Sequence, residues 1–244
     1  MALILNLETT SHVCSACLAR DGELLSIREN YEGKSHASLL TQFIDEMLKQ
    51  EHLAVTDLDA VAISEGPGSY TGLRIGVSTT KGLCYGAGIP LIGVSTLQAL
   101  SQGLLDALKV SNDPPPLDEH TLLVPLMDAR RMEVYSALLT PQLEFKRAVK
   151  AEIIDDSSFL DWLARYNLVF FGTGAPKTRQ TIDHPHAYFI DGIEPSAQHM
   201  SRLAEQKYQD GRFEDVAYFE PFYLKDFIAT KPRKNILPGN KSNH

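Results

Sequence analysis

The sequence predicts an α/β protein made of two lobes that repeat one design, each a mixed sheet with helices packed on it. A pattern of apolar strand, acidic residue, polar turn and second strand containing Ser-Ala occurs twice, at 3–18 and at 122–139. Each half later holds an apolar strand that ends in glycines, 61–63 before Gly66 and 168–171 before Gly172. The same order in both halves indicates an internal duplication.

A run of three prolines, at 114–116, separates the two halves, and such a run forms neither a helix nor a central strand. The first lobe is therefore predicted to span 1–110 and the second 117–225. The remaining segment, 226–244, is predicted to be a flexible end. Its basic residues are Lys231, Arg233, Lys234 and Lys241.

The individual elements follow from short apolar runs and from helical periodicity. Strands are predicted near 2–8, 13–19, 23–30, 59–64, 90–94, 121–127, 132–139 and 167–171. Helices are predicted near 36–51, 70–86, 95–109, 157–165 and 196–210. The helix at 36–51 has Ser35 as a plausible N-cap. Its apolar stripe consists of Leu40, Phe43, Ile44, Met47 and Leu48.

Composition favours a folded protein without a membrane span. The chain has 244 residues, is 43% hydrophobic and carries a formal net charge of −8. No apolar run reaches about 18 residues, and the N-terminus lacks the basic region of a signal peptide, so a cytoplasmic location is expected. The acidic balance disfavours a stand-alone RNA-binding protein, because such proteins carry a basic stripe.

The most distinctive segment is the glycine-rich turn after the strand at 59–64. It does not match the P-loop, the dinucleotide-binding fingerprint or the nucleophile elbow. The turn consists of Gly66, Pro67, Gly68, Ser69, Tyr70, Thr71 and Gly72. Its glycines indicate that backbone comes very close to another group.

The helix that follows carries small residues in rows, Gly72, Gly76 and Thr80 in one and Gly82 and Gly86 in another. Each interior glycine destabilises a helix by about 0.8–1 kcal/mol relative to alanine, so favourable packing must offset this cost. Two interpretations stay open: close packing inside the lobe, or a helix interface with another molecule.

The chain shows few candidates for catalysis. Cys14 and Cys17 lie three apart on a predicted strand and point to opposite faces, so they share neither a metal nor a disulfide. No pair of histidines has helical metal-binding spacing, so no metal site is predicted. Cys84 has no histidine nearby in the sequence, so no catalytic residue is predicted either. Glu8 and Asp128 end equivalent strands, where they would either hold a magnesium nucleotide across a cleft or cap their own turns.

Five segments together resemble the TsaB (YeaZ) family over nearly the whole chain. They are 4–10, 66–76 (GPGSYTGLRIG), 93–100, 128–135 and 221–225. The resemblance implies duplicated actin-like lobes of the ASKHA, ribonuclease H-like kind. Two departures stand out, since many relatives have aspartate where Glu8 stands and phenylalanine where Tyr70 stands.

The resemblance also implies a role. Proteins of this family are non-catalytic partners of the transferase TsaD, which acts with the ATPase TsaE to form threonylcarbamoyladenosine beside the tRNA anticodon. This implies contact with tRNA only through the complex, a homodimer when TsaD is absent, and ATP or ADP only at the complex interface. The implied TsaD-facing surface comprises His36, Leu40, Phe43, Leu73, Arg74, Gly76, Val77 and Lys81.

Two enzymatic alternatives remain at this point, a kinase-like nucleotide-binding protein and a glycoprotease-like peptidase. The first would use a weak nucleotide cleft formed by Glu8, Asp128, Gly172 and Gly174. Tight binding and turnover of ATP with magnesium by the isolated protein would favour it over a scaffold.

Overall fold

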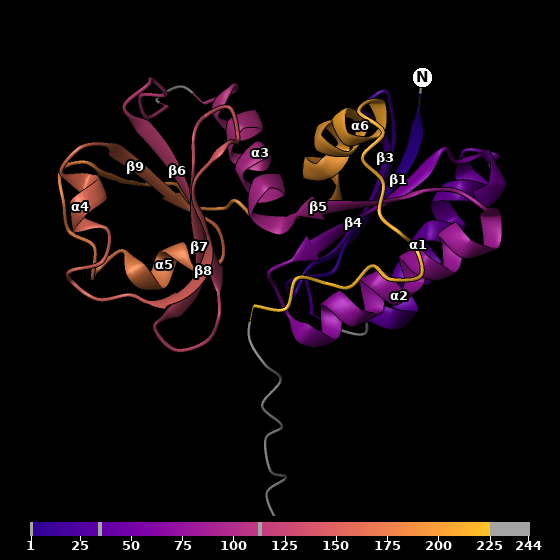
Figure 1. Ribbon diagram of the computed structural model, residues 1–244, viewed down its shortest axis with the longest axis horizontal. Helices are drawn as coiled ribbons and strands as arrows, with labels where there is room; N and C mark the ends of the chain where they lie inside the picture. The colour runs from indigo at the N-terminus through magenta and orange to yellow at the C-terminus, as the bar shows by residue number, and fades with distance from the viewer. Residues whose placement is uncertain (1, 34–35, 112–113, 225–244) are drawn as a thin grey trace, which may run out of the picture.

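The protein forms two lobes, each built on a five-stranded sheet (Figure 1). This computed structural model describes residues 2–33, 36–111 and 114–224. The first sheet consists of β1 (Leu3–Glu8), β2 (Cys14–Arg20), β3 (Glu23–Asn30), β4 (Ala60–Gly66) and β5 (Leu91–Ser95). The second consists of β6 (Thr121–Asp128), β7 (Glu133–Leu139), β8 (Phe145–Ile153), β9 (Asn167–Phe171) and β10 (Ala187–Phe189).

The two sheets have the same topology. Their strand orders are β3-β2-β1-β4-β5 and, counted from the matching edge, β8-β7-β6-β9-β10. In each, three antiparallel strands are followed by two parallel ones. This is the ribonuclease H-like order, so the prediction of duplicated actin-like lobes is confirmed.

Helices cover both faces of the first sheet. On one face lie α1 (His36–Gln50) and α2 (Tyr70–Ala87), whose apolar side chains join those of β1, β2 and β4. On the other face lie η2 (Ala197–Met200) and α6 (Ser201–Gln209). Because helices cover both faces, the residues of β1, β4 and β5 are almost all buried instead of alternating between buried and exposed.

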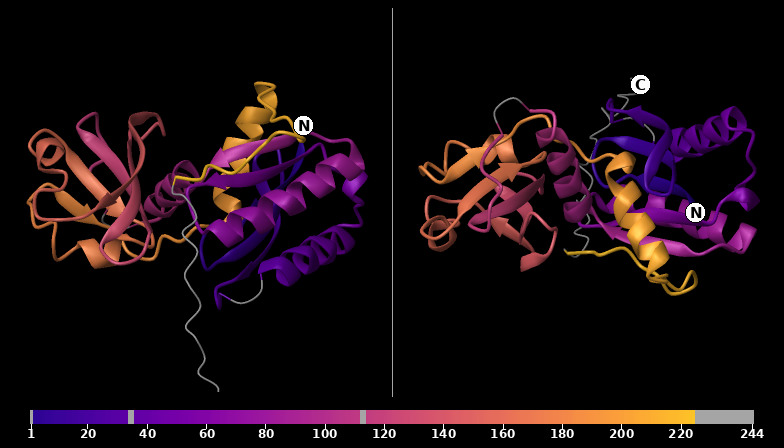
Figure 2. Two further views of the ribbon diagram at one scale, coloured as in Figure 1. Left: turned by 60° about the horizontal axis from the view of Figure 1, so that its bottom comes forward. Right: turned by 90° about the horizontal axis from the view of Figure 1, so that it is seen from above.

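The helix α3 (Thr96–Leu108) lies between the lobes (Figure 2). Its side chains at Leu97, Leu100 and Leu104 join the core of the second sheet, while Ala99 faces the first. The chain thus enters the second lobe's core before residue 110 and returns to the first lobe at η2. The predicted boundaries of 1–110 and 117–225 are therefore corrected, because apolar faces and not the proline run decide where each segment packs.

After α6 the chain runs back over the first lobe as residues 212–224, here called the strap. The Glu214 amide donates to the Leu91 carbonyl at 2.9 Å, beside the edge strand β5. The Lys81 ammonium donates to the carbonyls of Ala217 at 2.9 Å and Phe219 at 3.1 Å. The strap therefore covers the edge of the first sheet and crosses α2.

Most predicted elements are present within a few residues, but the second half differs. The helix predicted at 157–165 is a single turn, α4 (Leu160–Leu163), because the Asp155 carboxylate accepts hydrogen bonds from Ser157 and Ser158 and holds them in a turn. The strands β8 and β10 and two short helices, η1 (Val55–Asp57) and α5 (Ala175–Thr178), were not predicted. Ser35 and the tail 226–244 lie outside the described residues.

Within the parts of the chain that the structure describes, no helix is long and apolar enough to cross a membrane.

A tight contact fixes the junction of the lobes. The ring of His199, from η2, lies against Gly103 of α3, and a Cβ at that position would come within 2.5 Å of the ring. Burial lowers the pKa of His199, because it disfavours the charged form of the ring.

We expect Gly103→Ala to lower the free energy of unfolding by about 1–3 kcal/mol, because the added methyl overpacks the junction. In a His199→Ala background the same substitution should instead stabilise by about 1 kcal/mol, since the obstacle is gone and alanine is the better helix former. Urea denaturation of the four proteins measures this coupling. Equal effects of Gly103→Ala in both backgrounds would contradict the contact.

Candidate functional site

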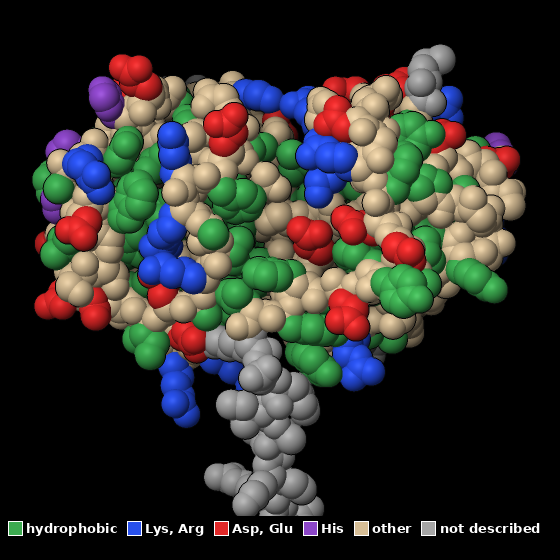
Figure 3. Space-filling view, viewed as in Figure 1, with side chains coloured by type: hydrophobic (Ala, Val, Ile, Leu, Met, Phe, Trp, Pro, Cys, Tyr) green, Lys and Arg blue, Asp and Glu red, His purple; other side chains and the backbone are tan. Residues whose placement is uncertain are grey.

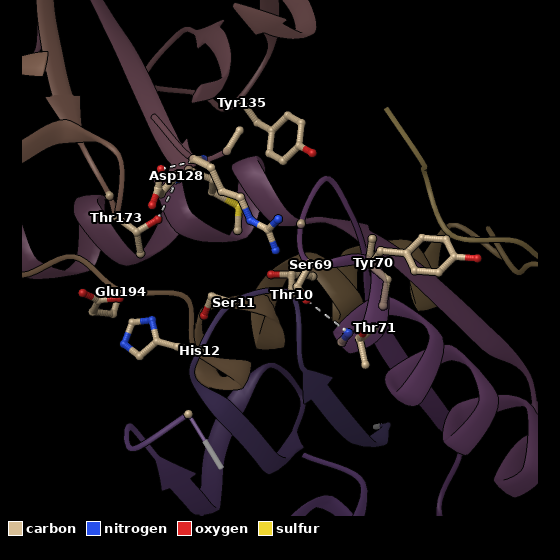
Figure 4. Close-up of a pocket in the computed structure, with 18 of the residues that line it drawn as sticks. Thr10, Ser11, His12, Ser69, Tyr70, Thr71, Asp128, Tyr135, Thr173 and Glu194 are labelled. Carbon is tan, nitrogen blue, oxygen red and sulfur yellow. Dashed lines mark hydrogen bonds between the residues drawn. The ribbon is translucent and has the colours of Figure 1, made fainter. Parts of the chain in front are cut away.

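A cleft of ≈ 1120 Å³ lies between the lobes and gathers the motifs singled out in the sequence (Figure 4). The first lobe contributes the turn after β1 and the glycine-rich turn at the start of α2. The second lobe contributes the turn after β6 and the segment after β9. Among the lining residues are Thr10, Ser11, His12, Ser69, Tyr70, Asp128, Tyr135, Thr173 and Glu194.

The glycine-rich turn packs directly on the backbone of the turn after β1. A Cβ on Gly68 would lie 2.6 Å from the Thr10 carbonyl oxygen, and one on Gly72 would lie 1.9 Å from that of Thr9. The Ser69 amide donates to the Thr10 carbonyl at 2.7 Å, and the Thr9 hydroxyl donates to the Gly72 carbonyl at 2.8 Å. The glycines therefore serve contact between two turns of the same lobe.

The first glycine row belongs to the same contact. A Cβ on Gly76 would meet the Thr9 hydroxyl at 2.3 Å and the Ile63 side chain at 2.7 Å. Gly82 and Gly86, in contrast, would meet nothing within 4 Å. The structure thus assigns the row of Gly72 and Gly76 to packing inside the lobe and leaves the second row open at the surface of α2.

The strap closes the other side of the glycine-rich turn. Gly66 has a φ of +119°, which side chains rarely adopt, and a Cβ there would lie 2.8 Å from the Phe222 carbonyl oxygen. The Phe222 amide donates to the Glu65 carbonyl at 2.7 Å. The rings of Tyr70 and Tyr223 lie 5.1 Å apart. The turn is therefore held between the β1–β2 turn and the strap.

Glu8 does not face the cleft, which corrects its predicted place in a nucleotide site. Its side chain is 1% exposed. One carboxylate oxygen accepts hydrogen bonds from the amide and the hydroxyl of Thr10, each at 2.5 Å, and the other has no partner among the described residues. Burial raises the pKa of this carboxyl group. Glu8 thus caps its own turn, the second of the two roles left open.

In the second lobe, Asp128 lies at the cleft but is also engaged. Its carboxylate accepts hydrogen bonds from Lys177 and from the Arg130 amide, the latter at 2.9 Å. Its backbone amide donates to the Thr173 hydroxyl at 3.0 Å. Gly172 lines the cleft, whereas Gly174 packs behind it against Leu126 and Met127. Of the four predicted nucleotide residues, the structure brings only Asp128 and Gly172 to the cleft.

The eight predicted partner contacts divide into two groups. Leu40, Leu73, Gly76 and Val77 are buried in their own lobe, so they support the outer surface without forming it. His36, Phe43 and Lys81 are half-buried and Arg74 is exposed. The His36 ring contacts the Ser11 carbonyl at 2.9 Å, and Lys81 is held by the strap.

Two residues, one on the outer face of α2 and one at the cleft, were not among the site residues predicted from the sequence. Tyr85, on the outer face of α2, is 86% exposed, although an isolated tyrosine in a helix gives no sequence signal. Arg130 lines the cleft with a φ of +72°. Arg130 belongs to the sequence motif at 128–135, but only the fold shows that the turn holding Arg130 faces the other lobe.

The three cysteines are free and buried. Cys14 faces α1, near the His36 carbonyl, and Cys17 faces α6, near Ser201, so the prediction of opposite faces is confirmed. Burial raises the pKa of Cys14 and Cys84 to about 11 and that of Cys17 to about 12. Among the described residues, no group of three or more His, Cys, Asp or Glu side chains is arranged to hold a metal ion.

Comparison with known proteins agrees with the fold. The family model described as "TsaD: tRNA N6-adenosine threonylcarbamoyltransferase" matches residues 29–232. The chain is 27% identical to a Haemophilus influenzae protein named "tRNA threonylcarbamoyladenosine biosynthesis protein TsaB", with 98% of each chain covered. It is 29% identical to the Escherichia coli protein of that name, with 98% and 99% covered.

Among solved structures, the chain is similar to a Pseudomonas aeruginosa protein described as having similarity to peptidase YEAZ. The TM-score is 0.75 at 25% identity, with 92% of this chain and 100% of that chain covered. A second structure, titled YeaZ from Pseudomonas aeruginosa, gives a TM-score of 0.74 at 24% identity, with 92% and 100% covered.

The two glycine rows of α2 make a matched pair of substitutions. We expect Gly72→Ala to lower the free energy of unfolding by more than about 3 kcal/mol, or to prevent folding, because its Cβ overlaps Thr9 backbone. Gly82→Ala, in the same helix, should stabilise by about 0.8–1 kcal/mol. Urea denaturation monitored by circular dichroism measures both, and a Gly72→Ala protein as stable as wild type would refute the packing.

Glu8 should make stability depend on pH in a defined direction. Because its pKa is raised on folding, the native state binds this proton more tightly, and stability is lost as pH rises above the ordinary value of about 4.5. Glu8→Gln keeps the acceptor oxygen and removes the titration. Between pH 4 and 7 we expect wild type to lose stability relative to Glu8→Gln, and parallel pH profiles would show that Glu8 is charged without cost.

Proposed function

We propose, because this chain belongs to the TsaD family of tRNA N6-adenosine threonylcarbamoyltransferases, that it is an accessory subunit in the formation of threonylcarbamoyladenosine in tRNA. The observation that carries the proposal is similarity to two proteins named TsaB over almost the full length of each chain. The process in their names is tRNA threonylcarbamoyladenosine biosynthesis. This chain would bind TsaD, activate it and act together with TsaE.

The geometry of the turns supports a non-catalytic role. A kinase-like site needs free backbone amides that can cradle phosphates. In the first lobe the Thr10 amide donates a hydrogen bond to the Glu8 carboxylate, and in the second the Arg130 amide donates to the Asp128 carboxylate. Both carboxylates that would have faced a nucleotide therefore satisfy their own turns, and no observation favours the kinase-like or peptidase alternative.

We assign the TsaD-binding surface to the outer faces of α1 and α2. These helices lie side by side on the first sheet (Figure 1). Of the residues predicted from the sequence, Arg74, Phe43 and His36 reach this surface. Tyr85 adds an exposed ring between Gly82 and Gly86, which leave open space on either side of it. Tyrosine, tryptophan and arginine are enriched among the residues that contribute most to binding at protein interfaces.

The proposal has three further parts, which concern self-association, nucleotide binding and the modification of tRNA. The same face would pair two copies of this chain when TsaD is absent, since it presents apolar surface to solvent. ATP or ADP would bind only at the interface formed with TsaD. TsaD, and not this chain, would modify the tRNA, so this chain would contact tRNA only through the complex.

Replacing Tyr85 with alanine tests the surface. We expect Tyr85→Ala to weaken binding to TsaD at least about 10-fold in calorimetric titration, because an aromatic anchor is lost. Ile153→Ala is the matched control, since Ile153 is 72% exposed on β8 of the other lobe. Normal binding by Tyr85→Ala would exclude this face, and unchanged tRNA modification by TsaD and TsaE without this chain would overturn the accessory role.

A further inference from the structure

The strap is attached to the rest of the first lobe at few points. Nine of its 13 residues are exposed and none is buried. Figure 3 shows hydrophobic and acidic side chains exposed beside one another over this part of the lobe. Val216 and Phe219 are the strap side chains that pack against the core of the first sheet. Because segments with few buried apolar contacts open at a low free-energy cost, the strap can open without unfolding the lobe.

The strap closes over the side chain of Glu65, at the end of β4. A Cβ on Gly93 would lie 2.5 Å from Glu65 Oε2 and 3.1 Å from the Phe219 ring, so the carboxylate and the ring share the space above Gly93. The Phe222 amide donates to the Glu65 carbonyl at 2.7 Å. Among the described residues, no donor forms a hydrogen bond to the Glu65 carboxylate. The same residue therefore anchors the strap by its backbone and meets it with an unpartnered acidic group.

Charged groups surround this carboxylate on several elements. The Lys207 ammonium, from α6, donates to the Gly93 carbonyl at 2.5 Å and favours the charged form of Glu65. Glu214, from the strap, disfavours that form because it carries a like charge. Lys81, from α2, donates instead to carbonyls of the strap. Burial is the largest influence, and it raises the pKa of the Glu65 carboxyl group.

From this geometry we propose that the strap is a clasp on the first lobe and that a negative charge on Glu65 opens it. Closing the strap over a charged carboxylate removes that group from water without giving it a hydrogen-bond donor, which is unfavourable. Closing it over the neutral acid avoids this cost. The clasp is therefore most stable at low pH, and its stability is lost as pH rises through the raised pKa.

An open clasp changes the side of α2. Lys81 loses its hydrogen bonds to the carbonyls of Ala217 and Phe219, so its ammonium becomes available on the surface. Gly66, in the glycine-rich turn, loses its close contact with Phe222. Because we assign this side of the lobe to TsaD, the clasp would regulate partner binding, and that consequence rests on the proposed function. The clasp itself goes beyond that function and does not depend on it.

Hydrogen exchange of the Glu214 and Phe222 amides, followed by NMR on the full-length chain, tests the clasp. Protection factors are compared because they remove the intrinsic pH dependence of exchange. Between about pH 5 and pH 8, both amides should lose protection at least about 5-fold in wild type and keep it in Glu65→Gln, which cannot ionise. The Ile154 amide, which donates to the Met132 carbonyl at 3.0 Å in the second lobe, should keep its protection in both proteins.

Two further variants separate the charge on Glu65 from the charge of the strap as a whole. Lys207→Ala removes the nearby cation, so it should enlarge the loss of protection with pH. In a Glu65→Gln background, Lys207→Ala should leave the pH profile flat, because the charge with which Lys207 interacts is gone. Glu220→Gln is the matched control, since Glu220 is an exposed acid of the same strap. It should give the wild-type profile.

Parallel profiles of wild type and Glu65→Gln would overturn the proposal. A Glu220→Gln profile as flat as that of Glu65→Gln would also overturn it, because the total charge of the strap would then be responsible. If the clasp fails these tests while Tyr85→Ala still weakens binding to TsaD, the inference falls and the proposed function stands. A clasp that passes them in a chain that does not bind TsaD would separate the two in the other direction.

Discussion

The structure depends on one close contact, the packing of the glycine-rich turn onto the backbone of the turn after β1. Gly68, Gly72 and Gly76 leave no space for a side chain against Thr9 and Thr10. Two hydrogen bonds tie the same segments together. Because Gly68 and Gly72 lie against backbone atoms, these neighbours cannot move aside as a flexible side chain would. It fixes where α2 begins and so sets the position of the whole outer face of the first lobe.

That contact also bears on the two turns that line the cleft between the lobes. The turn after β1 is pressed from one side by the glycine-rich turn and is capped from within by Glu8. Its counterpart in the second lobe is capped by Asp128 and braced by Lys177. In each turn, the carboxylate therefore accepts a hydrogen bond from a backbone amide of the same turn. The surface that we propose for TsaD is the outside of α1 and α2.

The two lobes are less separate than their repeated topology suggests. The helix α3 contributes to the core of the second sheet and also touches the first, while η2 and α6 return to the first lobe from the far end of the chain. The His199 ring lies against Gly103 at this junction. The strap then pairs beside β5 and reaches the glycine-rich turn. The C-terminal part of the chain is thus physically linked to its most distinctive motif.

The class of fold, the duplication and the places of most strands and helices could be predicted from the amino-acid sequence, because they follow from local apolar patterns and their repetition. It also marked 66–76 as a segment under unusual steric demand. The amino-acid sequence could not show whether Gly72 and Gly76 pack against another molecule or against the same lobe, since Thr9 lies 63 residues before Gly72. It also could not show whether Glu8 and Asp128 cap turns or face a cleft. These points required the three-dimensional structure, because they depend on which backbone lies opposite a given side chain. Long-range packing, and not local propensity, sets that arrangement.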